Sequence, residues 1–395
     1  MDELKIVGRS SELFTVDFEN KLSAIKEKLS DARVLVIGGA GSIGKSVVNE
    51  IFQLAPQCLH VVDISENNLV ELVRNTRSSI GYKNCDFKTF CLDFGSKEFE
   101  YFCQELGPYE YIFNLSALKH VRSEEDKFTM MRMLNVNVLY NVKLLKLMSN
   151  WNVKKYFCVS TDKAANPVNV MGASKRIMEQ VLFDETNKLP VSLARFANVA
   201  FSDGSLLHGF RQRMMNSQPL SAPCDVERYF ITSRESGLLC VLSGMLGHNR
   251  DIYFPNAANE LRLTKFSDIA IRFLNEFGFE PYFCDSENEA RSRVAELRKI
   301  NKWPLYLFES DTTGEKPYEE FYTKEEVLNF NDYHEIGIIK NEVGVSKHET
   351  HNLISFLENS YAEMSWEKSD IIQHMIKSIP EFHHIDTGLF LSKRM

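Results

Sequence analysis

The stretch VLVIGGAGSIG, residues 34–44, decides the fold. An apolar run is followed at once by glycines at positions 38, 41 and 44, where a helical pattern begins. The first glycine permits a tight turn, the second lets backbone amides approach a pyrophosphate, and the third lets helix and strand pack closely. The spacing therefore predicts a dinucleotide-binding turn between a strand and a helix.

Asp63 indicates which dinucleotide binds. It ends the next apolar run, HVVDI (60–64), 19 residues after Gly44. A carboxylate at this place accepts hydrogen bonds from both ribose hydroxyls and repels a 2′-phosphate, so it favours NAD over NADP. A glycine-rich turn without a ligand is the alternative interpretation, and the strand–turn–helix context disfavours it.

Further apolar runs extend the pattern along the chain. Runs apolar on consecutive positions are typical of strands buried on both faces of a parallel sheet, and helical segments separate them. Strands that alternate with helices predict an α/β fold, a Rossmann-like doubly wound parallel sheet. The remaining runs cover residues 87–93, 111–116, 155–160 and 191–196.

The regularity of this pattern suggests four parts. We expect an N-terminal lead-in (1–30), an NAD-binding Rossmann domain (31–200), a smaller substrate-binding domain (201–330) and a helical C-terminal extension (331–395). These boundaries follow changes in pattern, because strand and helix signals become irregular after Phe196.

Composition bounds the function. The chain has 395 residues, 44% of them hydrophobic, and a net charge of −8 without a basic face, which argues against a nucleic-acid or membrane partner. No run of about 18 apolar residues predicts a membrane span, and the N-terminus does not resemble a signal peptide. Eight scattered cysteines without a Cys-x-x-Cys pair predict a cytoplasmic protein. We expect no metal site, because His348 and His351 lack an evident third ligand.

Topology predicts where the cofactor contacts lie, because ligands bind outside the carboxyl ends of parallel strands. Asp93 and Phe94 follow the third strand and are expected beside the adenine. Residues after the fourth strand would pass the ribose and phosphates. The full predicted set is Gly38, Gly41, Ser42, Ile43, Gly44, Asp63, Asp93, Phe94, Leu115, Ser116, Ala117 and Lys175.

The stretch FCVSTDKAANPVNVMGASKR, residues 157–176, carries the chemistry. Thr161, Asp162 and Lys163 end the fifth strand at the ligand-bearing edge, where turn capping is the alternative explanation. Lys175 on the following helix can reach the nicotinamide ribose. In short-chain dehydrogenases a catalytic tyrosine stands four residues before this lysine, and here the position holds Met171.

STDKAANPVNVMGASKR (160–176) resembles the active-site segment of nucleotide-sugar 4,6-dehydratases of the extended short-chain dehydrogenase superfamily, above all the UDP-N-acetylglucosamine 4,6-dehydratase group. Many members of that group have methionine in place of the tyrosine. Four further segments agree with the resemblance: GGAGSIG with DISENNL (63–69), LSALKHV (115–121), RFANV (195–199) and TGEKPYEEF (313–321).

The resemblance implies the catalytic roles. Asp162 is the general acid at carbon 6 of the sugar, Lys163 the base at carbon 5, and Thr161 the hydrogen-bond donor to the carbon 4 oxygen. Burial near Lys175 and the cationic nicotinamide is expected to lower the pKa of Lys163. The 4-hydroxyl proton would leave to Asp162 through Thr161, or through a water relay.

The resemblance also implies the partners. The substrate would be UDP-N-acetylglucosamine or a close analogue, and helices at 128–151 and from 171 onward commonly pair between subunits, which predicts a homo-oligomer. A 4-epimerase and a catalytically silent NAD-binding scaffold are the rival hypotheses. The expected substrate contacts are Lys119, Asn198, Arg228, Glu315 and Lys316.

Overall fold

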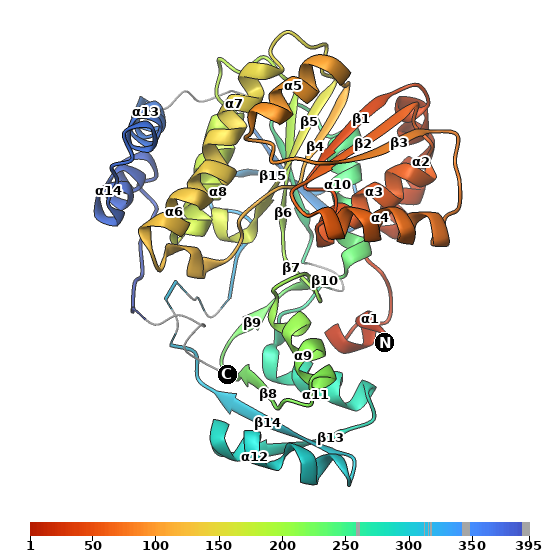
Figure 1. Ribbon diagram of the computed structural model, residues 1–395, viewed down its shortest axis with the longest axis vertical. Helices are drawn as coiled ribbons and strands as arrows, with labels where there is room; N and C mark the ends of the chain where they lie inside the picture. Colours follow the sequence, from red (N-terminus) through yellow and green to blue (C-terminus); the bar gives the residue numbers. More distant parts are fainter. Residues whose placement is uncertain (258–260, 312, 315, 317, 342–347, 389–395) are drawn as a thin grey trace.

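A computed structural model describes residues 1–395 except residues 258–260, 312, 315, 317, 342–347 and 389–395. A nine-stranded sheet forms the larger part of the molecule (Figure 1). Its order is β15-β16-β11-β6-β5-β4-β1-β2-β3. The strands are β1 (Arg33–Ile37), β2 (Cys58–Asp63), β3 (Asp86–Cys91), β4 (Tyr111–Asn114), β5 (Lys155–Thr161), β6 (Val191–Phe196), β11 (Asp251–Pro255), β15 (Val327–Asn329) and β16 (Ile336–Lys340).

The first six strands are parallel and lie in the order 3-2-1-4-5-6, as in dinucleotide-binding Rossmann folds. Residues of β4 and β6 are buried throughout, because helices cover both faces of the sheet. The predicted α/β Rossmann-like fold is thus confirmed. The apolar runs of the central strands match their burial on both faces, whereas β3 lies at the edge of the sheet and is partly exposed.

Two helical layers cover the sheet. Helix α10 (Ser233–Leu246) packs against α2 (Thr15–Leu29) and α3 (Ser42–Gln53) on one face. On the other face α8 (Val170–Leu182) packs beside α6 (Lys127–Leu134) and α7 (Tyr140–Leu147), which a π-helical turn, η2 (Asn135–Leu139), joins (Figure 1). The remaining helices of this part are α4 (Glu66–Ser79) and α5 (Lys97–Leu106).

The Rossmann part is not contiguous in sequence. Strands β11, β15 and β16 and helices α2 and α10 belong to it, although they lie outside the expected range of residues 31–200. Strand β11 pairs parallel to β6, and β16 returns antiparallel to β11. These strands extend the sheet at the edge next to β6.

The smaller domain contains a three-stranded parallel sheet, β13-β14-β8, and has its own apolar core. Phe210, Phe273 and Trp303 are buried in that core together with Ile6 from the lead-in. Its elements are α1 (Glu3–Val7), β8 (Leu220–Pro223), α9 (Leu206–Met215), α11 (Phe266–Glu276), β13 (Glu280–Cys284), α12 (Glu287–Arg298) and β14 (Lys302–Phe308), with short strands β7 (Asn198–Val199), β9 (Glu227–Arg228), β10 (Phe230–Ile231) and β12 (Thr264–Lys265).

Two C-terminal helices, α13 (His348–Glu363) and α14 (Lys368–Ser378), pack against α8 and lie at the outside of the sheet domain (Figure 1). Their apolar side chains, such as Leu357 and Met375, form one buried cluster with Met131 and Ile177. Part of the surface on which subunit pairing is expected is therefore covered by the chain's own C-terminal helices. None of the described helices is both long and apolar enough to cross a lipid bilayer.

Candidate functional site

The glycines of the 38–44 turn differ in what the protein itself requires. Gly38 has a φ of +72°, and a Cβ there would lie 2.7 Å from the backbone nitrogen of Ser116. A Cβ at Gly44 would lie 2.3 Å from the carbonyl oxygen of Gly38. At Gly41 the nearest protein atom would be 3.5 Å away. Packing therefore explains Gly38 and Gly44, whereas Gly41 leaves room at the N-terminus of α3 for a phosphate to approach, as the expected dinucleotide requires.

Gly41→Ala and Gly44→Ala should separate these two requirements. Gly41 has a φ of −73°, which alanine adopts readily, so Gly41→Ala should change thermal stability little and weaken NAD binding by about tenfold or more. Gly44→Ala should destabilise the fold by about 1–3 kcal/mol, because its methyl group would meet fixed backbone. Calorimetric unfolding and NAD titration check both. Equal NAD affinity in Gly41→Ala and wild type would contradict the assignment.

Asp63 lies at the carboxyl end of β2 with both oxygens held by backbone amides. Oδ2 accepts from the nitrogen of Ala40 at 3.0 Å, and Oδ1 accepts from the nitrogen of Ser65 at 2.9 Å. The carboxylate is thereby tied to the glycine turn. A small pocket adjoins it, lined by Ile37, Gly38, Val62, Asp63, Ile64, Leu92 and Ser116. The Asp63 carboxylate thus lies at the end of β2, where a carboxylate is expected to recognise the ribose of a dinucleotide.

The other predicted cofactor residues follow the third and fourth strands. Asp93 pairs with Arg132 at 2.8 Å, and Phe94 is buried against the rings of Phe99 and Tyr140. The backbone nitrogen of Leu115 donates to the carbonyl of Ile37 at 2.8 Å, which brings the 115–117 segment across the end of β1. Ile43 packs partly buried against the core, and the hydroxyl of Ser42 accepts from the nitrogen of Asp203 at 2.8 Å.

Asn137, which was not predicted from the sequence, fixes the segment that follows β4 to helix α8. Its Oδ1 accepts from the nitrogen of Leu118 at 3.0 Å, and its Nδ2 donates to the carbonyl of Leu118 and to the hydroxyl of Ser174. Asn137 is fully buried in the π-helical turn η2. π turns often occur at functional sites, but a helical apolar pattern does not reveal one in the sequence.

Thr161, Asp162 and Lys163 form a hydrogen-bonded group at the carboxyl end of β5. The Thr161 hydroxyl donates to Asp162 Oδ1 at 2.9 Å, and Lys163 Nζ donates to the same oxygen at 3.1 Å. The backbone nitrogen of Lys163 donates to it as well, at 2.9 Å. Asp162 is 4% exposed. A hydroxyl, a carboxylate and an amine thus converge where β5 meets a short 3-10 turn, η3 (Asp162–Ala164).

Helix α8 packs directly on this turn. A Cβ at Gly172 would lie 2.5 Å from the carbonyl oxygen of Lys163, so the close approach needs a glycine there. Lys175 is buried and its Nζ donates to the carbonyl of Val159 at 3.1 Å. Burial lowers the pKa of Lys175. Met171 is 4% exposed and belongs to the apolar cluster beneath α13 and α14.

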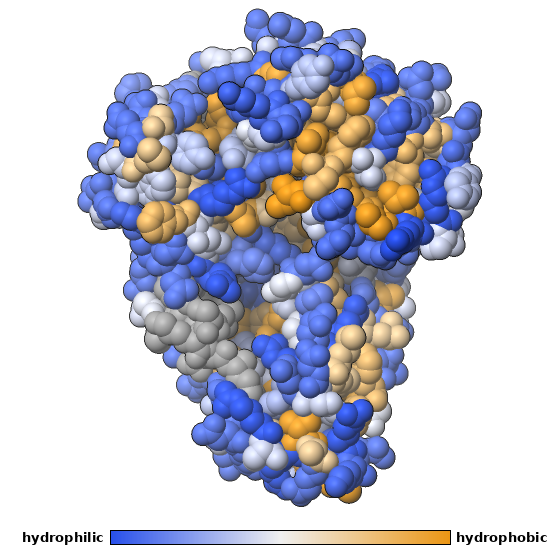
Figure 2. All heavy atoms as spheres, in the orientation of Figure 1, coloured by the Kyte–Doolittle hydropathy of each residue, from blue (hydrophilic) through white to orange (hydrophobic). Residues whose placement is uncertain are grey.

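A buried glutamate, Glu319, joins the turn that carries Lys163 to Arg228 of the smaller domain. Its Oε1 lies 3.6 Å from Lys163 Nζ and 3.9 Å from Arg228 Nη2, and its Oε2 lies 3.9 Å from Lys316 Nζ. Three predicted residues, Lys163, Arg228 and Lys316, therefore meet around one carboxylate. The surface is hollowed where the two domains meet (Figure 2).

Burial and neighbouring charges shift the pKa values of Lys163 and Glu319. Burial lowers the pKa of Lys163, but the carboxylates of Asp162 and Glu319 together raise it above its ordinary value. The expectation of a lowered pKa for Lys163 is therefore wrong in this structure. Burial raises the pKa of Glu319 although Lys163 lowers it. Sequence reasoning missed Glu319, because nothing in the polar run TGEKPYEEF marks one of its carboxylates as buried.

The loop that carries Lys316 is fastened to the loop before α8. Lys316 Nζ donates to the carbonyl of Asn166 at 2.5 Å, and the Asn169 amide donates to the carbonyl of Gly314 at 3.0 Å. Arg228 Nη1 donates to the carbonyl of Lys316 at 2.9 Å. Glu315 lies outside the described residues.

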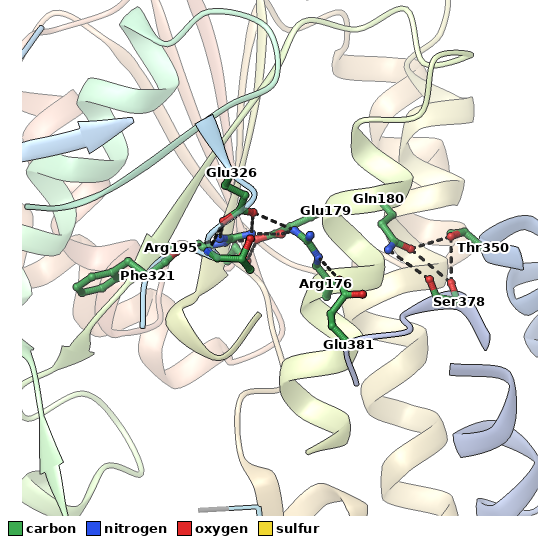
Figure 3. Close-up of polar contacts among 11 residues, drawn as sticks. Arg176, Glu179, Gln180, Arg195, Phe321, Glu326, Thr350, Ser378 and Glu381 are labelled. Atoms are coloured by element: carbon green, nitrogen blue, oxygen red, sulfur yellow. Dashed lines mark hydrogen bonds and ion pairs between the residues drawn. The ribbon is translucent and has the colours of Figure 1, made fainter. Parts of the chain in front are cut away.

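A second buried ion-pair network lies between strand β6 and helix α8 (Figure 3). Arg195 on β6 is fully buried and donates to Glu179 of α8 at 2.9 and 2.8 Å. It also donates to Glu326 at 2.8 Å and to the carbonyl of Phe321 at 2.9 Å. The hydroxyl of Ser160, adjacent to Thr161, donates to Glu179 at 2.6 Å. The network therefore links β5, β6 and α8 to the segment that carries Glu319.

Two predicted substrate residues lie outside these networks. Lys119 Nζ donates to the hydroxyl of Ser202 at 3.2 Å, and burial lowers its pKa. Asn198 is half-buried on the short strand β7, which pairs with β10. Among the described residues, no hydrogen bond or ion pair joins either residue to Glu319 or to Thr161, so their roles stay predictions.

Cys58, His60 and Asp86 are the group of potential metal ligands found among the described residues. His60 Nδ1 already contacts the hydroxyl of Tyr109 at 2.6 Å, and Nε2 contacts Asp86 at 3.2 Å. Both ring nitrogens thus have protein partners, and the group lies along β2 and β3, apart from the catalytic turn. His348 and His351 are exposed on α13.

The sequence matches the model of the polysaccharide biosynthesis protein family over residues 34–341. An uncharacterized membrane protein of Methanocaldococcus jannaschii is 27% identical over 78% of this chain and 86% of that protein. The capsular polysaccharide biosynthesis protein CapD of Staphylococcus aureus is 25% identical over 78% of this chain and 48% of that protein, so this chain spans about half of its length. A UDP-glucose 4-epimerase of Rickettsia massiliae is 24% identical over 80% of this chain and 86% of that protein.

Solved structures share the fold. Pen from Bacillus thuringiensis superposes with a TM-score of 0.65 at 21% identity and covers 84% of this chain and 98% of its own. DesIV from Streptomyces venezuelae, a dTDP-glucose 4,6-dehydratase solved with NAD and TYD, superposes with a TM-score of 0.56 at 16% identity. The match covers 73% of this chain and 87% of DesIV. At these low sequence identities, the structural similarity supports the fold alone.

Proposed function

The chain belongs to the polysaccharide biosynthesis protein family, and on that premise we propose that it is an NAD-dependent nucleotide-sugar 4,6-dehydratase acting on UDP-N-acetylglucosamine or a close analogue. One observation carries the proposal. Thr161, Asp162 and Lys163 are hydrogen-bonded to one another at the ligand-bearing edge, while the usual tyrosine position holds a buried methionine. The site thus offers an acid and an amine suited to elimination.

The residues of the glycine turn, with Asp63 and Lys175, would hold NAD, which supplies a temporary hydride acceptor for carbon 4 and returns the hydride to carbon 6. The 4-hydroxyl proton passes through the Thr161 hydroxyl to Asp162, which lies 2.9 Å away. Asp162 then gives this proton to the carbon 6 hydroxyl, and water leaves. Lys163 removes the carbon 5 proton and returns it when the hydride arrives. The sum is the loss of one water.

Arg228 and Lys316 support a diphosphate-bearing substrate, because both cations lie beside Glu319 at the junction of the domains. Arginine binds phosphate oxygens through paired donors, and lysine binds them as a compact charge. Lys119 and Asn198 are proposed as further sugar or phosphate contacts.

Incubation with NAD and UDP-N-acetylglucosamine tests the proposal by mass spectrometry. We expect a product lighter than the substrate by one water and no net consumption of NAD. The rival 4-epimerase activity, which the Rickettsia relative's name suggests, would give an isomer of unchanged mass. A silent scaffold would bind NAD and leave the sugar nucleotide unchanged. Either of these results would contradict the dehydratase proposal.

A further inference from the structure

The base at carbon 5 presents a chemical difficulty. Lys163 Nζ is bound to Asp162 at 3.1 Å, and the surrounding carboxylates favour its charged form. An ammonium group has no lone pair, so it cannot take a proton from carbon until it has given one away. Asp162 cannot receive that proton, because in the proposed reaction it already carries the 4-hydroxyl proton to carbon 6.

Glu319 is the second carboxylate that pairs with Lys163 among the described residues. It is 3% exposed, and its Oε1 lies 3.6 Å from Lys163 Nζ, on the side of the smaller domain. Its backbone neighbourhood is fixed, since the carbonyl of Phe321 accepts from the fully buried Arg195. Glu319 is therefore held beside the amine by the fold and is screened from water.

We propose that Glu319 is the proton partner of Lys163, so that the base at carbon 5 is the Lys163–Glu319 pair and not the lysine alone. This inference rests on the proposed dehydratase function. One Nζ–H bond breaks as an O–H bond forms on Glu319, and the freed lone pair of Nζ takes the carbon 5 proton. The pair has then gained one proton. When the hydride reaches carbon 6, the same steps run backward and carbon 5 recovers a proton.

The charges around Glu319 suit this exchange. Asp162 and Lys163 face it from η3, Arg228 from β9 and Lys316 from its own loop. Burial raises the pKa of Glu319, and the cation of Lys163 lowers it only in part. A raised carboxyl pKa favours the protonated form of Glu319, which is the form that this exchange requires.

Glu319→Gln tests the pair, with Glu320→Gln as the matched control. Glutamine keeps the size of the side chain but cannot accept the proton, so turnover should fall by about 10²- to 10⁴-fold. Glu320 is exposed and accepts from the Asn166 amide at 3.0 Å, so Glu320→Gln should keep the wild-type rate. A wild-type rate in Glu319→Gln would overturn the inference.

The pH profile separates proton transfer from a purely structural role. In the wild type, activity should fall in acid as Glu319 becomes protonated. In Glu319→Gln the remaining base is the amine of Lys163, so the residual activity should rise toward alkaline pH. A slower variant with the wild-type pH profile would show that Glu319 only shapes the site and would overturn the inference.

Labelling of Lys163 tests the pair without any turnover. Acetic anhydride modifies neutral amines, so the pH midpoint of Lys163 labelling, followed by peptide mass spectrometry, reports its pKa. The midpoint should fall in Glu319→Gln, which lacks one neighbouring carboxylate, and should not move in Glu320→Gln. If the wild type released no water from any sugar nucleotide, the dehydratase proposal would fail on its own. An unmoved midpoint in Glu319→Gln would then still overturn the pairing.

Discussion

Asp162→Asn should lower the rate of water loss by about 10²- to 10⁴-fold and leave NAD affinity unchanged. Asparagine retains the Oδ1 that accepts from Thr161, from the nitrogen of Lys163 and from Lys163 Nζ, so the turn should keep its shape. The amide cannot accept and release a proton in this way. In the proposed reaction, Asp162 must accept a proton during the oxidation at carbon 4 and release it during the elimination. Single-turnover assays with mass detection, beside NAD titration, measure the two effects.

Asp268→Asn is the control, because Asp268 is exposed on α11 in the smaller domain and should behave as wild type. Absorbance of NADH during the Asp162→Asn reaction separates the two proton transfers. We expect no NADH to accumulate, since the 4-hydroxyl proton also leaves through Asp162. NADH that accumulates without water loss would show that another group accepts the 4-hydroxyl proton.

Arg195→Met should reduce the free energy of unfolding by about 3–5 kcal/mol. The arginine is fully buried, and its removal would leave Glu179 and Glu326, which are 2% and 10% exposed, without their main cation. Burial raises the pKa of Glu179, but Arg195, Arg176 and Ser160 together lower it to about 2. Denaturant unfolding of both proteins measures the difference.

The pH dependence of stability gives an independent check of this network. The pKa of Glu179 in the folded protein is about 2, below its ordinary value of 4.5. The contribution of this carboxylate to the free energy of unfolding is therefore complete above pH 4.5 and is lost as the pH falls from about 4.5 toward 2. In Arg195→Met, Glu179 keeps only Arg176 and Ser160 as partners, so the pKa of its buried carboxyl should rise. Denaturant unfolding at a series of pH values should therefore show the stability difference from wild type shrinking in this acid range.

Arg176→Met is the matched control for Arg195→Met. Arg176 contacts the same two glutamates at 3.1 and 3.3 Å but is 19% exposed, so its loss should cost only about 1 kcal/mol. Equal losses in the two variants would contradict the assignment of the network's stability to Arg195.

The part of the fold that depends on local pattern was predictable from the sequence. The run before Gly38 and the apolar runs that follow it predict strands whose limits in the structure lie within two residues of the expected ones. Most of these strands are buried on both faces, which demands consecutive apolar side chains. The joining of β11 and β16 to the same sheet was not predictable, since pairing over such separations leaves no local periodicity.

Some residues of the candidate site could likewise be predicted from local sequence, and others could not. Thr161, Asp162 and Lys163 adjoin in sequence at the end of a strand, so their convergence could be inferred. Glu319 lies in a loop whose polar letters predict solvent exposure, yet it is 3% exposed beside Lys163. Arg195 appears in a strand as an isolated charge, and only the fold shows the two glutamates that neutralise it.

The Arg195 network also affects the order in which a nascent chain can fold. Arg195 leaves the ribosome 131 residues before Glu326, a delay of roughly 7–26 seconds at translation rates of about 5–20 residues per second. During that interval β6 can form, but its arginine has only Glu179 as a carboxylate partner from this network. The first six strands should therefore remain loosely packed near α8 until the 319–326 segment is synthesised. The edge of the sheet that carries Thr161 would become rigid only on a chain that has been translated beyond Glu326.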